Sequence, residues 1–243
     1  MNILGVIPSR YGSTRFPGKP LIDIGGKTMI QRVYEQAKKS KSLSEVVVAT
    51  DDQRIFDEVK RFGGNVIMTS SSHESGTERC NEVVSKSSEN YDVIINIQGD
   101  EPFIDPKQID QLCSCFNDEK TDIATLVKEI NNNKELFNPN RPKVDIDKNC
   151  FAKMFSRETI PALNNFPKAD WLKHQKYYKH IGMYGYRTNV LIKICKLDPS
   201  PLEVKERLEQ LRWLENDYKI KVAETKLEAI AVDTPEEFKK NHF

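Results

Sequence analysis

The sequence predicts an α/β protein built on a doubly wound, mostly parallel sheet with a smaller inserted α+β subdomain. Short apolar segments alternate with segments of helical periodicity through the first half of the chain. These segments are apolar on both faces, which is typical of strands in a covered parallel sheet. The second half is less regular, and Asn- and Pro-rich stretches punctuate it.

The first half supplies four expected strands with three helices between them. Gly63 and Gly64 mark the end of the second helix. The helices are long enough to make right-handed crossovers between parallel strands. The expected strands cover residues 3–7, 45–50, 66–68 and 92–97, and Pro8 stops the first of them. The expected helices cover residues 29–39, 54–62 and 77–86.

The second half contains an expected insertion at about residues 131–198, inside a single domain that spans residues 1–243. Residues 147–149 predict the turn of a hairpin, and residues 158–178 predict mostly loop. Further strands are expected at residues 123–127, 144–146, 151–155, 179–187, 220–225 and 230–232. Helices are expected at residues 106–116, from 188 to about 196, once or twice over 203–216, and at 234–240.

Composition narrows the class of protein. The chain has 243 residues, of which 38% are hydrophobic and 30% charged, enough for a sizeable core. Its 37 basic and 36 acidic residues leave a formal charge of +1, so no overall field recruits nucleic acid or an anionic membrane. Five cysteines without a Cys-x-x-Cys pair indicate reduced thiols, and no apolar run is long enough to span a membrane. We therefore expect a cytoplasmic protein that binds no nucleic acid and inserts into no membrane.

A basic loop follows the first expected strand. Glycines in such a loop let backbone amides approach phosphate oxygens, and its cations neutralise their charge. Because ligands of open α/β sheets bind at the carboxyl ends of strands, the loop predicts a polyanion site. The alternative is a basic loop that is simply solvated. The loop contains the cations Arg10, Arg15 and Lys19 among Gly12, Ser13, Thr14 and Gly18.

Two common phosphate-binding motifs are excluded. The spacing from Gly12 to Lys19 is one residue too long for a Walker A loop, and Pro20 stands where Ser or Thr would bind magnesium. The first strand is not followed by Gly-x-Gly-x-x-Gly, which argues against a dinucleotide-binding turn.

Two further stretches carry polar residues at expected strand ends. Residues 96–102 place Gln98, Asp100 and Glu101 after the fourth strand, where a carboxylate suits magnesium bound to a triphosphate. The alternative is a turn, because Gly-Asp-x-Pro is also good turn chemistry. In residues 73–79, Thr77 is a candidate N-cap. Arg79, near the positive end of a helix, is expected to reach outward to an anion or base.

Seven segments, in order, resemble the cytidylyltransferases that activate 3-deoxy-manno-octulosonate (Kdo). The resemblance extends from residue 3 to residue 237, and the number of motifs makes it specific. It departs from the family pattern at Asp145 and at residues 150–154, beside the sugar side of the site. The segments are residues 7–21, 73–79, 96–102, 155–157, 179–182, 208–212 and 232–236.

The resemblance implies a nucleotide-diphospho-sugar transferase-like fold and a reaction of CTP with the sugar acid that gives a CMP-sugar and pyrophosphate. It also implies Mg²⁺ as cofactor, a homodimer and a role in lipopolysaccharide biosynthesis. The insertion is then expected to supply the acceptor site, a dimer contact, or both.

The expected site residues fall into four groups. The catalytic residues are expected to be Lys19, Arg10 and Asp100. The nucleotide-binding residues are expected to be Arg10, Ser13, Arg15, Lys19, Ser72, His73, Ser75, Gly76, Arg79 and Gln98. The sugar-binding residues are expected to be Arg157, His180, Tyr184, Glu209 and Gln210, and the metal ligands Asp100 and Asp233.

Physical chemistry supports the same assignment. A triphosphate and a carboxylate repel each other by about 4 kcal/mol per pair of charges at 4 Å near a protein surface, so the site needs cations. Arg157 with His180 suits the carboxylate of the acceptor, although His180, on an expected strand and followed by Ile181, is equally typical of a core histidine. Asp233 ends an expected strand, and the capping box at residues 234–237 leaves its carboxylate available for a metal.

Two alternatives belong to other functional classes. One is a cytidylyltransferase for a related acid such as 8-amino-Kdo or sialic acid. The other is a catalytically inactive nucleotide-binding regulator, against which the set Lys19, Asp100 and Asp233 argues.

Overall fold

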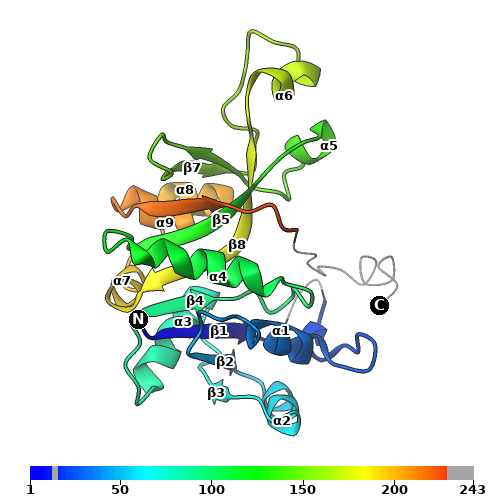
Figure 1. The fold of residues 1–243 in the computed structure, drawn as a ribbon, viewed down its shortest axis with the longest axis vertical. Helices are drawn as coiled ribbons and strands as arrows, with labels where there is room; N and C mark the ends of the chain where they lie inside the picture. The colour runs from blue at the N-terminus through cyan, green and yellow to red at the C-terminus, as the bar shows by residue number, and fades with distance from the viewer. Residues whose placement is uncertain (13–15, 229–243) are drawn as a thin grey trace.

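A mixed sheet organises the chain in the computed structural model, which describes residues 1–12 and 16–228 (Figure 1). Within these residues the main path of the sheet runs β3-β2-β1-β4-β8-β5-β9, and β6 and β7 join it beside β8. The strands are β1 (Ile3–Ser9), β2 (Glu45–Thr50), β3 (Val66–Met68), β4 (Val93–Asn96), β5 (Ile123–Glu129), β6 (Lys143–Ile146), β7 (Ala152–Ser156), β8 (Tyr178–Arg187) and β9 (Ile220–Glu224).

The helices alternate with the strands in the first half, as predicted. The longer ones begin at capping side chains, because Thr28, Asp52, Ser75 and Asp105 each accept a hydrogen bond from the first turn. The helices are α1 (Met29–Ala37), α2 (Gln53–Arg61), α3 (Gly76–Lys86), α4 (Pro106–Ser114), α5 (Asn133–Leu136), α6 (Trp171–His174), α7 (Thr188–Ile194), α8 (Pro201–Glu206) and α9 (Gln210–Glu215), with 3-10 turns η1 (Lys19–Leu21), η2 (Cys115–Asn117) and η3 (Lys168–Asp170).

The sheet is mostly parallel, and β8 is the exception on its main path. The strand β1 pairs in parallel with β2 and β4, and β5 pairs in parallel with β9. The strand β8 runs antiparallel between β4 and β5. The predicted doubly wound, mostly parallel sheet is therefore confirmed.

Alternating side chains of the strands build two cores. Ile3 and Ile7 of β1 pack in one cluster with residues of α1, α2 and α4. Leu4 and Val6, on the opposite face, pack with residues of α3, α7 and α9. The main sheet is thus covered by helices on both faces, and its strand ends are left to form the walls of a site.

The first strand runs further than predicted, to Ser9, because Pro8 costs no ladder hydrogen bond. The Val6 carbonyl accepts a hydrogen bond from Ile97 N at 2.8 Å, on the side of β4. Pro8 lies two residues further, so its missing N–H faces the same side. The pairing of β1 with β4 ends at Val6, so β4 offers no partner that the missing N–H of Pro8 would have to bind.

A projecting lobe, residues 131–177, rises from one end of the sheet and carries α5, α6, β6 and β7 (Figure 1). It has a small core of its own, made by Leu136, Trp171 and Tyr177 together with Ile130. Of the residues expected in the insertion, those of β8 belong to the main sheet, and those of α7 pack against the same core as α3.

The other expected elements within the described residues match the structure within two residues at each end, whereas η1 and α5 were not predicted. Residues 158–178, expected as loop, contain the short segments η3 and α6. The expected strand at 230–232 and helix at 234–240 lie outside the described residues. Across residues 1–12 and 16–228, no helix combines the length and the apolarity needed to cross a membrane.

Candidate functional site

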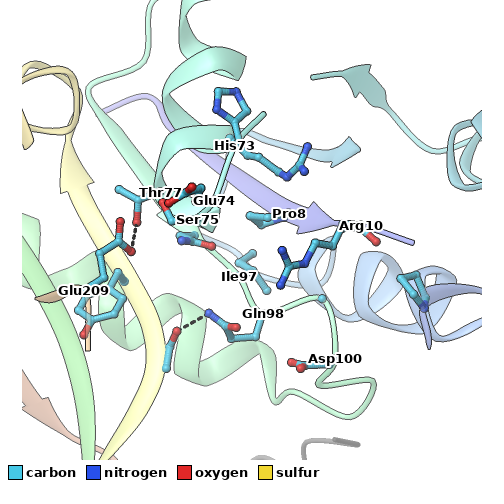
Figure 2. Close-up of a pocket in the computed structure, with 18 of the residues that line it drawn as sticks. Pro8, Arg10, His73, Glu74, Ser75, Thr77, Ile97, Gln98, Asp100 and Glu209 are labelled. Carbon is cyan, nitrogen blue, oxygen red and sulfur yellow. Dashed lines mark hydrogen bonds between the residues drawn. The ribbon is translucent and has the colours of Figure 1, made fainter. Parts of the chain in front are cut away.

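A cavity of about 320 Å³ opens at the carboxyl ends of β1 and β4 (Figure 2). The first turn of α3 and the strand β8 complete its wall, and most of its lining is polar. The cavity lies between the basic loop, which was predicted to bind a polyanion, and the acidic residues predicted to follow the fourth strand. Parallel neighbours β1 and β4 account for this meeting, since both end at the same edge of the sheet.

The basic loop closes on itself beside this cavity. Gly18 adopts a left-handed backbone (φ 71°), and its N–H donates a hydrogen bond to Tyr11 O at 3.0 Å. The Tyr11 ring lies against Gly18, and the Arg54 guanidinium stacks on the ring at 3.3 Å from its centre. Arg10 lines the cavity and points into it, whereas Ser13 and Arg15 lie outside the described residues (Figure 2).

Lys19, the first residue of η1, and Asp100, which follows β4, meet at the rim of the cavity. The Lys19 ammonium donates a hydrogen bond to Asp100 Oδ2 at 2.7 Å. Gly99, directly before Asp100, lets the chain after β4 pass close to the end of β1, because a Cβ there would lie 2.8 Å from Pro8 O. A cation and a carboxylate are therefore held together where a bound triphosphate would meet both.

The first turn of α3 supplies a second wall. Ser75 caps this helix, since its hydroxyl accepts a hydrogen bond from Glu78 N at 3.2 Å. The prediction that Thr77 is a candidate cap is wrong, because Thr77 lies inside the helix and donates to Glu209 Oε2 at 2.8 Å. His73, Ser75 and Gly76 line the cavity, as expected, whereas Ser72 lies outside its wall.

Arg79 does not reach outward. Its side chain is 4% exposed, and its guanidinium contacts Asp51 Oδ2 and Thr69 Oγ1, both at 2.7 Å. The outward prediction is wrong because Asp51, at the end of β2, neutralises a cation that sits unfavourably near a helix start. Arg79 still contributes to the cavity wall.

Gln98 joins the nucleotide side of the cavity to β8. Its amide nitrogen donates a hydrogen bond to Gly182 O, and the side chain lies on the cavity floor (Figure 2). Gly182 also lines the cavity and leaves room for this contact, since a Cβ there would be 3.8 Å from Gln98. One side chain thus fixes the spacing of two neighbouring strands at the site.

Tyr184 and Glu209 form the opposite end of the cavity. Burial raises the pKa of the Tyr184 phenol well above its usual range, and its hydroxyl has no hydrogen-bond partner among the described residues. Burial also raises the pKa of the Glu209 carboxyl, although hydrogen bonds from Thr77 and Ser75 oppose this shift. The neighbouring Gln210 is 5% exposed and has an amide nitrogen without a partner in the same part of the structure.

Three of the expected sugar-binding residues are absent from the wall that the described residues form. His180 lies between Phe155 and Tyr184, and its Nε2 is 2.9 Å from Thr125 Oγ1. Burial lowers its pKa to about 3, which fits the alternative of a core histidine. The other two are Arg157 and Gln210.

The Arg157 guanidinium binds backbone carbonyls. Its Nε donates to Glu206 O at 2.8 Å, and its two Nη groups donate to Pro139 O and Arg207 O at 3.3 Å. Arg207 has a left-handed backbone (φ 55°) at the end of α8. In this structure Arg157 therefore fixes a turn and does not face the cavity.

A magnesium ion fits the rim of the cavity. Magnesium takes one or two carboxylates and completes its shell with phosphate oxygens and water, and Asp100 offers one carboxylate there. Within residues 1–12 and 16–228 no three His, Cys, Asp or Glu side chains form a metal-binding cluster, so these residues alone offer no complete cage. Asp233 lies outside the described residues.

The expected site residues leave out several residues of the cavity wall, among them Thr77 and Ser9. The sequence around Thr77 indicates only a possible cap, because its contact with Glu209, 132 positions away, has no local signal. Ser9 is 4% exposed, lines the cavity and has a hydroxyl without a partner among the described residues. Its place directly before Arg10 at a strand end is a signal that sequence reasoning can use.

The sequence matches a known protein family and is similar to named proteins of other bacteria. A family model described as cytidylyltransferase matches residues 4–220. A protein of Parabacteroides distasonis is 56% identical over 99% of this chain and 96% of its own length, and one of Bacteroides thetaiotaomicron is 54% identical over 98% and 96%. Both are named 3-deoxy-manno-octulosonate cytidylyltransferase.

A solved structure is similar throughout. It is that of a CMP:2-keto-3-deoxy-manno-octonic acid synthetase complexed with CTP, with a TM-score of 0.92 and 41% identity over 99% of this chain and 97% of that one. A 4-diphosphocytidyl-2C-methyl-D-erythritol synthase from Anaerococcus prevotii shares the fold alone, with a TM-score of 0.64 at 13% identity over 98% and 93%.

Proposed function

The chain belongs to the cytidylyltransferase family, and from this premise we propose that it transfers CMP from CTP to 3-deoxy-manno-octulosonate (Kdo), releasing pyrophosphate. A hydroxyl oxygen of the sugar acid forms a bond to the α-phosphorus of CTP, and the bond to the β-phosphate bridging oxygen breaks. The hydroxyl proton is released, and no covalent enzyme intermediate is needed.

The observation that supports this proposal most is that one cavity joins a cationic end to a hydrogen-bonding end. Arg10 and Lys19 face the cavity from the strand ends, where they suit the charge of a triphosphate. Tyr184 and Glu209 lie at the other end, where a phenol and a carboxylate suit the hydroxyl groups of a sugar. Both substrates can therefore bind within one site, which gives the transfer its main advantage, the alignment of the reacting groups.

Residues of this chain also suit the base of the nucleotide. We assign recognition of the pyrimidine to the loop at residues 72–79 together with Gln98, because cytosine presents an amide-like edge to backbone groups and a side-chain amide. In the structure the Gln98 amide nitrogen donates a hydrogen bond to Gly182 O, which orients the side chain at the cavity.

The metal part of the proposal concerns Mg²⁺ held by Asp100 and Asp233. When bound, Mg²⁺ neutralises phosphate charge and polarises the phosphoryl oxygens. Asp100 lies beside Lys19 at the cavity rim, where its carboxylate would hold the ion against the phosphates. Asp233 is assigned from the sequence, as the carboxylate at the end of an expected strand.

We further propose a homodimer that acts in the cytoplasm, and a product used for lipopolysaccharide. The five cysteines are free thiols in the structure, which suits a reducing compartment. Size-exclusion chromatography with light scattering tests the dimer, for which a mass near that of one chain is the contrary result.

The activity is tested by pyrophosphate release from purified protein with CTP and each of three acids, Kdo, 8-amino-Kdo and sialic acid. The highest kcat/KM is expected with Kdo. Turnover of another acid in preference to Kdo would assign a related transferase, and tight binding of CTP without release of pyrophosphate under any condition would assign a regulator. Parallel reactions with ATP and GTP test the pyrimidine assignment, and equal use of these nucleotides would overturn it.

A further inference from the structure

The Thr77 hydroxyl occupies a position that helix capping does not explain. Thr77 is 2% exposed in the first turn of α3, whose cap is Ser75. Its Oγ1 lies 2.8 Å from Glu209 Oε2 and 3.4 Å from the Tyr186 hydroxyl. Because a carboxylate only accepts hydrogen bonds, the Thr77 proton points to Glu209 (Figure 2).

Glu209 is a carboxylate that needs such support. It lies directly before α9, at the end of the cavity next to Tyr184. The titratable and charged groups that interact with it are Arg212 and Glu203 from α9 and α8, Cys80 from α3, Tyr184 and Tyr186 from β8, and Cys195 after α7. Arg212 is already paired with Glu203 at 2.6 Å, so its charge is largely matched elsewhere.

Thr77 also belongs to the segment assigned to the nucleotide. It lines the cavity two residues after Ser75 and one after Gly76. A Cβ on Gly76 would lie 3.3 Å from Pro8 and 3.2 Å from the Asn96 amide, so the turn is packed tightly against the ends of β1 and β4. A side chain on this turn is therefore a rigid support for whatever it holds.

We propose that Thr77 is a positioning residue for the acceptor, whose hydroxyl holds the Glu209 carboxylate at the cavity edge, where it accepts hydrogen bonds from hydroxyl groups of the sugar acid. The inference rests on the proposed function for the identity of the acceptor. It makes the start of α3 a shared support, with its backbone facing the nucleotide and its threonine hydroxyl fixing the sugar side.

The test compares Thr77→Val, which keeps the shape and removes the donor, with Thr77→Ser, which restores it. In Thr77→Val the sugar acid KM should rise about tenfold or more, the effect of losing one hydrogen bond to a charged group, while the CTP KM changes less than about twofold. Thr77→Ser should return the sugar acid KM to near that of the wild type. Equal changes in both KM values would indicate distortion of α3 and overturn the inference, as would an unchanged sugar acid KM.

A second measurement separates positioning from general damage. The Thr77 hydrogen bond favours the ionised form of Glu209, so its loss raises the pKa of that carboxyl further. The acid limb of the pH profile for sugar acid kcat/KM should then move to higher pH in Thr77→Val but not in Thr77→Ser.

The same shift is measurable without turnover, by carbon NMR titration of Glu209 in protein labelled at its glutamates. If the wild type releases no pyrophosphate with Kdo, the proposed function is wrong. The titration still decides whether Thr77 controls Glu209, and equal Glu209 pKa values in the wild type and Thr77→Val would overturn that inference.

Discussion

The ammonium group of Lys19 lies 2.7 Å from Asp100 Oδ2, although 80 residues separate them along the chain. Their side chains are 13% and 26% exposed, so the pair is shielded from bulk water but open to the cavity. Such a pair keeps the charges of the site balanced until phosphates and a cation bring new partners to both groups.

Lys19→Met tests the cationic half of this pair. The change keeps the length of the side chain and removes the charge that opposes the triphosphate. We expect kcat/KM for CTP to fall about 100-fold or more, the usual effect of losing one fixed charge at a reacting group. Lys27→Met is the matched control, because Lys27 pairs with Glu35 on an exposed surface. Similar losses in both variants would contradict the assignment.

The carboxylates proposed to hold Mg²⁺ are tested by Asp100→Asn and Asp233→Asn. Each change keeps the shape of the side chain and removes one negative charge, so a higher Mg²⁺ concentration should be needed for half-maximal turnover, and kcat should fall sharply. Activity is measured as a function of Mg²⁺, after thermal unfolding shows that the variants are folded. Near-normal turnover of Asp233→Asn at limiting Mg²⁺ would remove Asp233 from the metal site.

The closure of the basic loop is tested by Gly18→Ala. Gly18 has φ 71°, and an added Cβ would lie 3.1 Å from the Tyr11 ring, which Arg54 holds from the other side. The ring must shift, so we expect the CTP KM to rise about tenfold. Gly26→Ala is the control, since Gly26 has φ 81° but nothing within 4 Å of an added Cβ. If both variants bind CTP equally well, the packing of Tyr11 on Gly18 does not set the loop.

The buried His180 predicts how stability depends on pH. Its folded pKa of about 3 lies below the unfolded value near 6.5. As the pH falls below about 6.5, His180 is therefore protonated in the unfolded chain but stays neutral in the folded chain, which lowers the free energy of unfolding. This lost stability amounts to about 2 kcal/mol between pH 7 and pH 5. Urea unfolding measures this loss. Between pH 7 and pH 5 the free energy of unfolding should fall by about 2 kcal/mol less in His180→Gln than in the wild type.

For the histidine test, His174→Gln is the control for replacing an exposed histidine. An identical pH dependence in His180→Gln and the wild type would mean that His180 titrates normally.

Arg157→Ala distinguishes the two roles assigned to this arginine. Three backbone carbonyls accept its hydrogen bonds in the structure, so its removal should lower the free energy of unfolding by about 2 kcal/mol. For a chain of this length that corresponds to about 4–8 °C in melting temperature.

Lys153→Ala is the control for Arg157→Ala, since the exposed Lys153–Asp145 pair on the neighbouring hairpin should contribute little. An unchanged melting temperature with a higher sugar acid KM would instead place Arg157 at the acceptor, as the family resemblance predicts.

The sequence was sufficient for most elements of the fold and for assigning Lys19 and Asp100 to the same edge of the sheet, but not for their direct contact. Lys19 and Asp100 follow apolar strands, and the rule that ligands gather at the carboxyl ends of such strands brings them together. Strand order was not accessible in this way. Periodicity predicts that residues 179–187 form a strand, but its place between β4 and β5 depends on long-range pairing.

Partners that lie far away in sequence explain the errors at the site. Arg79 was expected to face outward because its own helix repels it, and the carboxylate that holds it inward, Asp51, comes from a different strand end. The family motif also places Arg157 near the sugar, which stays a prediction, and the carbonyls that bind it here belong to the distant segments around 139 and 206–207. Local sequence carries no record of such partners.

The central position of β8 has a consequence for the order in which the protein folds. During synthesis β5 leaves the ribosome before either of its neighbours in the sheet, because β8 and β9 both come later in the chain. The strands β1 to β4 can assemble first, but β4 cannot be joined to β5 until residues 178–187 have been made. At about 5–20 residues per second, the apolar face of β5 waits several seconds for its partners. The nascent chain therefore passes through a stage in which half of its sheet is complete and the next strand has nothing to pair with.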